Sequence, residues 1–225
     1  MTEEGSDFLA LPEAGRGPGV VVLHEAWGLT PDIKWAAQRL AEYGYVVMVP
    51  DLKPVIRGSL GAVAQVMAGQ GPLVDHATAF LDIASERPEV EAGEGLGLIG
   101  FSMGAALGLL LRHLPRVAVL GLNYGLVPTR TGDLNVPVVA SFGGHDRLLP
   151  RSGSALRELA VRSNVEHDIE VYPGVGHSFM TPVDAHHPAT LRRVLSIGYE
   201  PDAADQAWAR TRAFLSLHMT VPSPA

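Results

Sequence analysis

The nine residues from 98 to 106, LIGFSMGAA, constrain the fold more than any other part of the chain. An apolar run leads into Gly100, Ser102 stands between two glycines, and the residues that follow are apolar. This order predicts a buried strand that turns sharply into a helix, with the serine at the tip of the turn. Backbone at such a tip adopts a positive φ and leaves no space for side chains two residues away, so Gly100 and Gly104 meet a steric requirement. A serine in this place is typical of a nucleophile, although it is also typical of a simple helix N-cap.

Strand-like and helix-like segments alternate along the chain. Apolar runs predict strands over 7–12, 19–23, 45–50, 95–101, 116–122, 136–142 and 168–172. Apolar residues at helical spacing predict helices over 31–43, 73–85, 103–113, 154–161 and 203–217. The glycine-rich stretch 53–71 is interpreted as a cap or pocket wall, and 182–188 as a loop. This alternation predicts an α/β fold with one domain over residues 1–225, in which helices cover both faces of a mostly parallel, doubly wound sheet.

Composition excludes several classes of function. The formal net charge of -7 argues against nucleic acid as a partner, because phosphates require clustered Lys and Arg. It also provides no basic surface for anionic lipids, and no apolar run is long enough to span a membrane. There are 0 cysteines, so disulfides and thiolate metal sites are absent. The first seven residues are acidic and lack the pattern of a secretion signal, so we expect a cytoplasmic protein.

Three polar residues follow predicted strands in an order typical of hydrolases. Ser102 follows the strand at 95–101, Asp146 follows the strand at 136–142, and His177 follows the last strand. The carboxyl ends of parallel strands meet at one edge of a sheet, where ligands bind. Serine is a weak nucleophile unaided, so His177 would remove its proton and later give it to the leaving group. Asp146 would fix the tautomer of the histidine and stabilise its charged form.

Each of these residues also has a simpler interpretation. Asp146 alone suits a turn or a helix cap, and His177 alone suits a hydrogen-bonded histidine in a glycine-rich turn. The conjunction of three residues in the right order favours the triad. The glycines at 95, 97 and 100 also fit a dinucleotide-binding pattern, but they lie within the predicted strand and no acid follows at the required spacing, so we expect no cofactor. We expect no metal at Asp184, His186 and His187 either, because adjacent histidines diverge.

With these motifs, the chain resembles the dienelactone hydrolase family of the α/β-hydrolase superfamily over nearly its whole length. The most specific pieces are VVLHE at 21–25, GFSMG at 100–104 and YPGVGH at 172–177. The resemblance implies an α/β-hydrolase fold. It also implies an oxyanion hole, a pair of hydrogen-bond donors for the negative oxygen of the intermediate, formed by the backbone amides of Ala26 and Met103. Glu25 matches a family glutamate beside the nucleophile, although a hydrogen bond that anchors its loop is an equally good interpretation.

The resemblance places three further residues, Trp27, Phe179 and Thr181, against the substrate or behind the residues that touch it. Two positions depart from the family pattern. Dienelactone hydrolases themselves use a cysteine where this chain has Ser102, and their carboxylate-binding arginine, four residues after the histidine, is Thr181 here. Serine still gives an acyl-enzyme, so the chemistry survives, but dienelactone as the substrate is put in question.

The function expected from the sequence is therefore that of a serine hydrolase that cleaves a carboxylic ester or lactone, in the manner of a carboxylesterase or carboxymethylenebutenolidase. Its partner would be a small-molecule ester or lactone. Two alternatives stay open: a peptidase or thioesterase on the same triad, and a ligand-binding protein that kept the fold but lost catalysis. The sequence leaves the oligomeric state undetermined.

Overall fold

The computed structural model describes residues 7–56, 58–91, 93, 95–128, 131–182 and 189–219. Within these residues, seven strands form one sheet in the order β1-β3-β2-β4-β5-β6-β7. The strands are β1 (Phe8–Ala10), β2 (Gly19–Leu23), β3 (Val46–Val49), β4 (Leu96–Phe101), β5 (Val117–Asn123), β6 (Val138–Gly143) and β7 (His167–Tyr172). Only β1 runs antiparallel to its neighbour, and every other pair in this sheet is parallel. The strands β2, β3, β4 and β6 are buried along their whole length, as a sheet covered on both faces requires.

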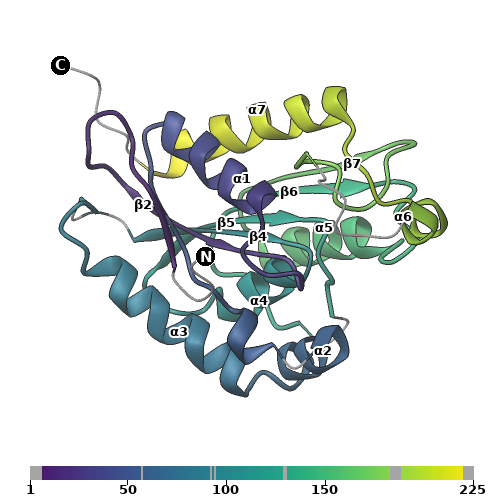
Figure 1. Cartoon of the computed structure of the whole chain (residues 1–225), viewed down its shortest axis with the longest axis horizontal. Coiled ribbons are helices and arrows are strands. Elements are labelled where there is room, and N and C mark those ends of the chain that lie inside the picture. The colour runs from purple at the N-terminus through teal and green to yellow at the C-terminus, as the bar shows by residue number, and fades with distance from the viewer. Residues whose placement is uncertain are drawn as a thin grey trace.

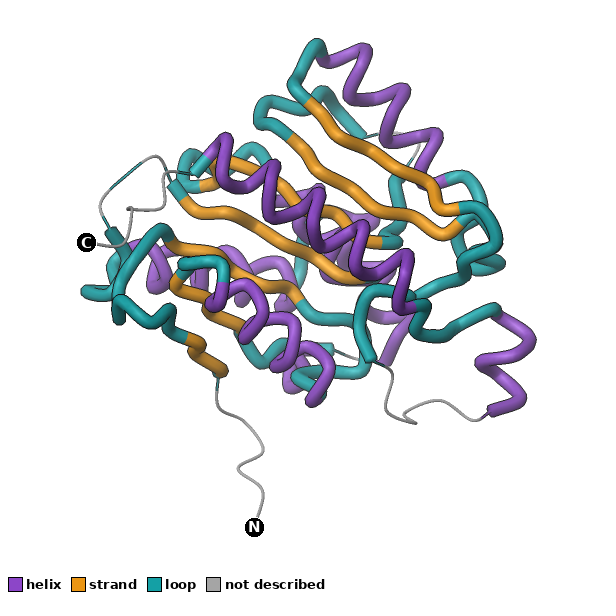
Figure 2. Tube along the Cα trace, turned by 90° about the horizontal axis from the view of Figure 1, so that it is seen from above, coloured by secondary structure: helices purple, strands orange, loops and turns teal. Residues whose placement is uncertain are grey.

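Helices cover both faces of the sheet (Figure 1). On one face lie α1 (Pro31–Glu42) and α7 (Pro201–His218), which pack against alternate residues of the central strands, among them Ile99 and Phe101. The opposite face is covered by α2 (Gly58–Ala68), α3 (Pro72–Ser85), α4 (Met103–Leu111) and α5 (Ser152–Ser163). Seen from above, the helices of the first face lie nearly along the strands (Figure 2). This arrangement confirms the α/β fold predicted from the sequence.

The order of the strands reverses its direction between β2 and β4. From β2 the chain moves outward to β3, on whose far side β1 lies, and from β4 it continues in the other direction to β7. The carboxyl ends of strands on either side of such a reversal leave room for a ligand because their following loops diverge. The loop that begins at His24 and the turn at Ser102 leave the two strands that flank this point.

Two helices differ from the sequence prediction. The helix α2 occupies most of the stretch that we interpreted as a glycine-rich cap, because Ala62 and Val66 are buried in the core and outweigh the weak helix propensity of its glycines. The short helix α6 (Ala189–Leu195) was not predicted either. Of the loop expected at 182–188, residues 183–188 lie outside the described residues. A short 3-10 helix, η1 (Lys53–Val55), precedes α2. None of the described helices combines the length and the apolar character needed to cross a membrane.

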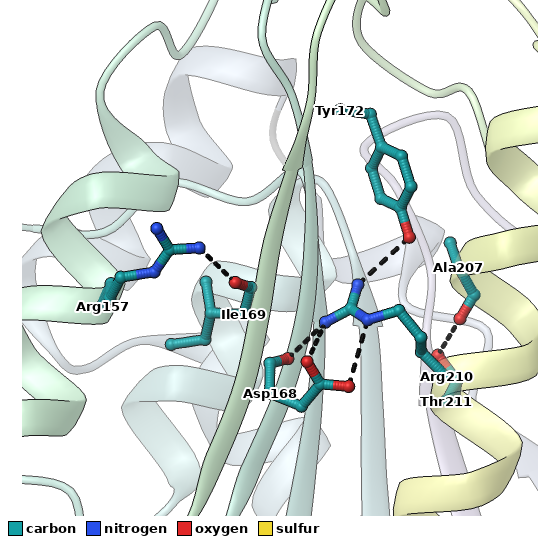
Figure 3. A network of polar contacts seen from close by, with 7 residues as sticks. All are labelled: Arg157, Asp168, Ile169, Tyr172, Ala207, Arg210 and Thr211. Carbon is teal, nitrogen blue, oxygen red and sulfur yellow. Dashed lines mark hydrogen bonds and ion pairs between the residues drawn. The ribbon is translucent and has the colours of Figure 1, made fainter.

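An arginine fixes α7 to the last strand of the sheet (Figure 3). The Arg210 guanidinium donates to both carboxylate oxygens of Asp168, at 2.6 and 3.1 Å, and to the Asp168 carbonyl oxygen at 2.8 Å. A further donor reaches the Tyr172 hydroxyl at 3.1 Å. From the other face, Arg157 on α5 donates to the Ile169 carbonyl oxygen. The strand that leads into the His177 loop is therefore held from both sides.

Candidate active site

Ser102 occupies a strained turn between β4 and α4. Its φ of 51° and ψ of -112° lie in a region that non-glycine residues rarely adopt, at a cost of about 1–3 kcal/mol. The Ser102 amide donates to the Asn123 carbonyl oxygen at 2.9 Å, which ties the turn to β5. A side chain at Gly104 would collide with the Leu23 carbonyl, and one at Gly100 would collide with the backbone of α4. The steric need for glycine at both positions is thus as predicted from the sequence, and Gly104 in addition allows the helix to begin directly against β2.

The structure brings Ser102, His177 and Asp146 together in one hydrogen-bonded chain. Ser102 Oγ lies 2.9 Å from His177 Nε2, and His177 Nδ1 lies 2.7 Å from Asp146 Oδ2. The other carboxylate oxygen, Oδ1, accepts from the amides of Leu148 and Leu149 at 2.8 and 3.0 Å. Because the ionised carboxylate only accepts, Nδ1 carries the proton and Nε2 presents a lone pair to the serine hydroxyl. Asp146 and His177 are buried, at 3% and 4% exposed, whereas Ser102 is partly exposed.

Backbone hydrogen bonds between loops hold this chain in place. The amides of Gly144 and His145 donate to the carbonyl oxygens of Tyr172 and Val175, both at 2.8 Å, which joins the Asp146 loop to the His177 loop. The His177 amide donates to Ser196 at 2.7 Å, and its carbonyl accepts from Gly198 at 3.1 Å. The segment after α6 therefore supports the histidine. The sequence carries no pattern that identifies this support, because it acts through backbone atoms.

The loop after β2 reaches the same place as the start of α4. Its Gly28 amide donates to the Glu25 carbonyl at 3.2 Å, Gly28 adopts a positive φ of 97°, and its lack of a side chain lets Lys53 pack closely against it. The amides of Ala26 and Met103 donate no hydrogen bond to another residue in the described part of the chain. Met103 is the first residue of α4, where helix amides favour negative charge. Both amides remain candidates for an oxyanion hole.

Glu25 joins the loop after β2 to the His177 loop. Its Oε1 accepts from the Ser178 hydroxyl at 2.9 Å, and no hydrogen bond connects its carboxylate to Ser102 within the described residues. Burial raises the pKa of the Glu25 carboxyl, while the nearby charge of His177 and the Ser178 hydrogen bond act in the opposite direction. The hydrogen bond from Ser178 supports the interpretation that Glu25 anchors its loop. A part of Glu25 in the reaction stays a prediction.

Three other predicted residues lie in different surroundings. Trp27, beside Ala26, is 44% exposed. Phe179 has no exposed surface and packs against Tyr124 and Tyr172, with ring centroids 5.8 and 5.2 Å away. Thr181 is also buried. Phe179 and Thr181 are therefore out of contact with solvent, from which a substrate would arrive.

Tyr124 is a site residue that sequence reasoning missed. It follows β5 with a φ of 40°, and its ring meets the His177 ring edge-on at 5.1 Å. Its buried hydroxyl lies beside Thr181 and Glu25, and burial, together with the charge of Glu25, raises its pKa well above the usual range. Its place directly after a central strand was the one available signal, because functional residues gather at strand ends.

No three or more His, Asp or Glu side chains within the described residues are grouped as a metal site requires. The residues weighed for a metal in the sequence, Asp184, His186 and His187, lie outside the described residues.

Replacement of Gly104 should test the close approach of α4 to β2. Gly104→Ala forces a side chain against the Leu23 backbone and should lower the free energy of unfolding by about 1–3 kcal/mol or more. Gly108→Ala is the matched control in the same helix, because its new methyl group would lie 3.6 Å from the nearest side-chain atom and adds helix propensity worth up to about 1 kcal/mol. Urea unfolding measures both. Equal midpoints for the two variants would contradict the packing described here.

Replacement of Glu25 should change how stability depends on pH. A carboxyl whose pKa is raised on folding binds its proton more tightly in the folded state, so stability falls as pH rises above its ordinary value of 4.5. Glu25→Gln removes this loss, so its stability relative to wild type should rise as pH increases above about 4.5. Ser178→Ala removes a hydrogen bond that lowers the same pKa, so the total fall in stability should be larger and extend to higher pH. A constant difference between Glu25→Gln and wild type across this range would refute the shift.

Comparison with known proteins places the chain in a family. The model of the dienelactone hydrolase family matches residues 6–219. The carboxymethylenebutenolidase of Rhodococcus opacus is 24% identical over 229 residues, which covers 95% of this chain and 86% of that protein. The crystal structure of a dienelactone hydrolase-like promiscuous phosphotriesterase from metagenomic libraries is 25% identical, covers 95% of this chain and 92% of its own, and superposes with a TM-score of 0.74. The chain belongs to the dienelactone hydrolase family.

Proposed function

We propose that this protein is a serine hydrolase that cleaves a carboxylic ester or lactone through an acyl-serine intermediate. The observation that carries the proposal is the continuous chain from Ser102 Oγ through His177 to Asp146, with hydrogen bonds of 2.9 and 2.7 Å. A nucleophile, a base and a residue that orients the base are the parts that acyl transfer needs. Membership of the dienelactone hydrolase family supports the same reaction class.

The first half of the reaction forms the acyl-enzyme. Ser102 Oγ attacks the carbonyl carbon of the ester while its proton passes to His177 Nε2. The carbonyl oxygen becomes an oxyanion and accepts hydrogen bonds from the amides of Ala26 and Met103. The bond to the leaving alcohol then breaks, and the alcohol takes the proton from His177. In a lactone the alcohol remains part of the same molecule.

The second half returns the free enzyme. Water gives one proton to His177 and attacks the acyl carbon, and Ser102 leaves with that proton while the carboxylic acid is released. Asp146 stabilises the charged imidazole in both halves. Its Oδ1 is held by the amides of Leu148 and Leu149, so Oδ2 stays directed at the histidine. The whole sequence needs no group beyond these residues and water.

The surroundings of the triad favour an uncharged substrate. Thr181 stands where the dienelactone hydrolases carry an arginine, and it is neutral and buried. The half-exposed indole of Trp27, next to the proposed oxyanion donor Ala26, offers an apolar surface to an acyl or alcohol group. Arg57, which could attract an anion from the segment after β3, lies outside the described residues. We therefore place neutral short-chain esters before carboxylate-bearing lactones such as those that the name of the Rhodococcus relative implies.

Replacement of Ser102 tests the proposed reaction. Ser102→Ala should fold normally yet lose ester hydrolysis by about 10³-fold or more, because no other side chain can form the acyl-enzyme. A serine-directed phosphonate should label the wild type and leave this variant unmodified. Ser216→Ala, at an exposed serine of α7, is the matched control and should keep both activity and labelling. Full turnover by Ser102→Ala would remove the serine from the mechanism, and an unlabelled wild type would favour the ligand-binding alternative.

The second test concerns substrate charge. The buried, neutral Thr181 cannot form the charge-assisted pair of hydrogen bonds that an arginine makes with both oxygens of a carboxylate. The net charge of -7 gives no long-range attraction for anions. The ratio kcat/KM for a neutral aryl acetate, corrected for intrinsic reactivity, should therefore exceed that for a dienelactone. Preference for the dienelactone after this correction would mean that another residue binds its carboxylate.

A further inference from the structure

His24 is buried at the point where β2 ends and the loop that carries Ala26 begins. Its side chain has no exposed surface, and both of its ring nitrogens form hydrogen bonds. Nδ1 lies 2.6 Å from the Glu25 carbonyl oxygen, and Nε2 lies 2.9 Å from the Leu52 amide nitrogen. The proposed mechanism does not use this histidine, and its ring contacts backbone atoms on two different loops.

The two partners select one tautomer of the ring. The Leu52 amide can only donate, so Nε2 must accept and carries no proton. The single proton of a neutral ring is therefore on Nδ1, which donates it to the Glu25 carbonyl. A second proton on Nε2 would meet the amide hydrogen of Leu52 directly. Burial lowers the pKa of His24, which also favours the neutral ring.

The carbonyl that His24 holds belongs to the same peptide unit as the Ala26 amide. In a planar trans peptide, the C=O and the following N–H point in opposite directions. Fixing the direction of the Glu25 carbonyl therefore fixes the direction of the Ala26 N–H. The Gly28 amide also donates to this carbonyl, at 3.2 Å, but that bond comes from the same loop and cannot fix the loop relative to the sheet.

We propose that His24 is a positioning residue, which aims the Ala26 amide at the oxyanion by holding the Glu25–Ala26 peptide plane. The proposal rests on the proposed function, since it assigns Ala26 to the oxyanion hole. Through Nε2 the same ring ties the loop to the segment after β3. The His24 carbonyl in turn lies against the start of α4, because a side chain at Gly104 would come within 2.8 Å of it. The amides of Ala26 and Met103 are thus held as one unit.

A purely structural role for His24 makes a different prediction from a positioning role. If the ring only filled space and satisfied the Leu52 amide, loss of either hydrogen bond would reduce stability, and activity would follow stability. If the ring aims the Ala26 amide, loss of the Nδ1 bond lowers the rate much more than loss of the Nε2 bond does. The two hydrogen bonds can be removed separately, because the side-chain NH2 of asparagine stands near the place of Nδ1 and the side-chain oxygen of glutamine near that of Nε2.

The decisive comparison is therefore His24→Asn against His24→Gln. His24→Asn keeps a donor for the Glu25 carbonyl, and its kcat on a neutral ester should stay within about threefold of wild type. His24→Gln keeps an acceptor for Leu52 but loses that donor, and kcat should fall about 10- to 100-fold with little change in KM, since loss of a whole oxyanion donor costs about 10²–10³-fold. The affinity for a boronic acid, whose serine adduct mimics the tetrahedral intermediate, should fall in parallel with kcat. Equal activities in the two variants, or activities that simply follow their unfolding midpoints, would overturn the proposal.

A measurement on the wild-type protein covers the case in which either variant fails to fold. Nuclear magnetic resonance of protein with isotopically labelled histidine should show His24 at neutral pH as the uncharged tautomer protonated at Nδ1. A ring protonated at Nε2, or charged at neutral pH, would overturn the proposal without any substitution.

Phosphonate labelling separates this proposal from the proposed function. An unlabelled wild type would remove the hydrolase reaction, and with it the oxyanion hole that His24 serves. A labelled wild type with equal activities in His24→Asn and His24→Gln would leave the hydrolase in place and remove His24 alone.

Discussion

The close approach of α4 to β2 is the constraint on which the rest of the site depends. Gly104 allows the first turn of the helix to touch the Leu23 carbonyl, and no other residue type fits there. This contact sets the position of the Ser102 turn, whose strained φ of 51° costs about 1–3 kcal/mol. The almost wholly buried helix that follows offsets this cost, because each large apolar side chain that it buries contributes about 1.5–3 kcal/mol. A strained serine is stable here because a buried strand precedes it and a buried helix follows it.

The other half of the triad depends on links between loops rather than on one tight contact. The Asp146 and His177 loops follow neighbouring parallel strands, so their separation is set by the sheet itself. Backbone hydrogen bonds then join them to each other and to the segment after α6. The Arg210 guanidinium, which holds β7 against α7, extends this support to the edge of the sheet. Both buried members of the triad are thus fixed through main-chain atoms, whereas Ser102 is fixed by packing of its turn together with the hydrogen bond from its amide to β5.

The sequence predicted those features of the fold and the site that depend directly on residue type. The steric need for glycine at positions 100 and 104 and the apolar runs of the buried strands leave clear patterns, so the strands and the meeting of Ser102, Asp146 and His177 could be predicted. Sequence reasoning failed where tertiary contacts decide. Burial of Ala62 and Val66 stabilises a helix in a glycine-rich stretch. The contact between the Tyr124 and His177 rings depends on how strands far apart in sequence are placed side by side in the sheet. The burial of Phe179 and Thr181 could not be predicted for the same reason, because the direction of a side chain in a loop depends on the residues that pack against it.

The pairing of β2 with β4 sets the positions of the site residues independently of much of the chain between these two strands. Leu23 lies opposite Gly100 in the parallel register, so the loop that begins at His24 and the turn at Ser102 are neighbours although more than seventy residues separate them in sequence. The intervening crossover is tied to the site at Leu52, before α2 begins. Helices α2 and α3 can therefore lengthen, shorten or change their outer surface without shifting the paired strand ends. The segment that can vary in sequence to accommodate different substrates is therefore distinct from the segments that hold the reacting groups in position.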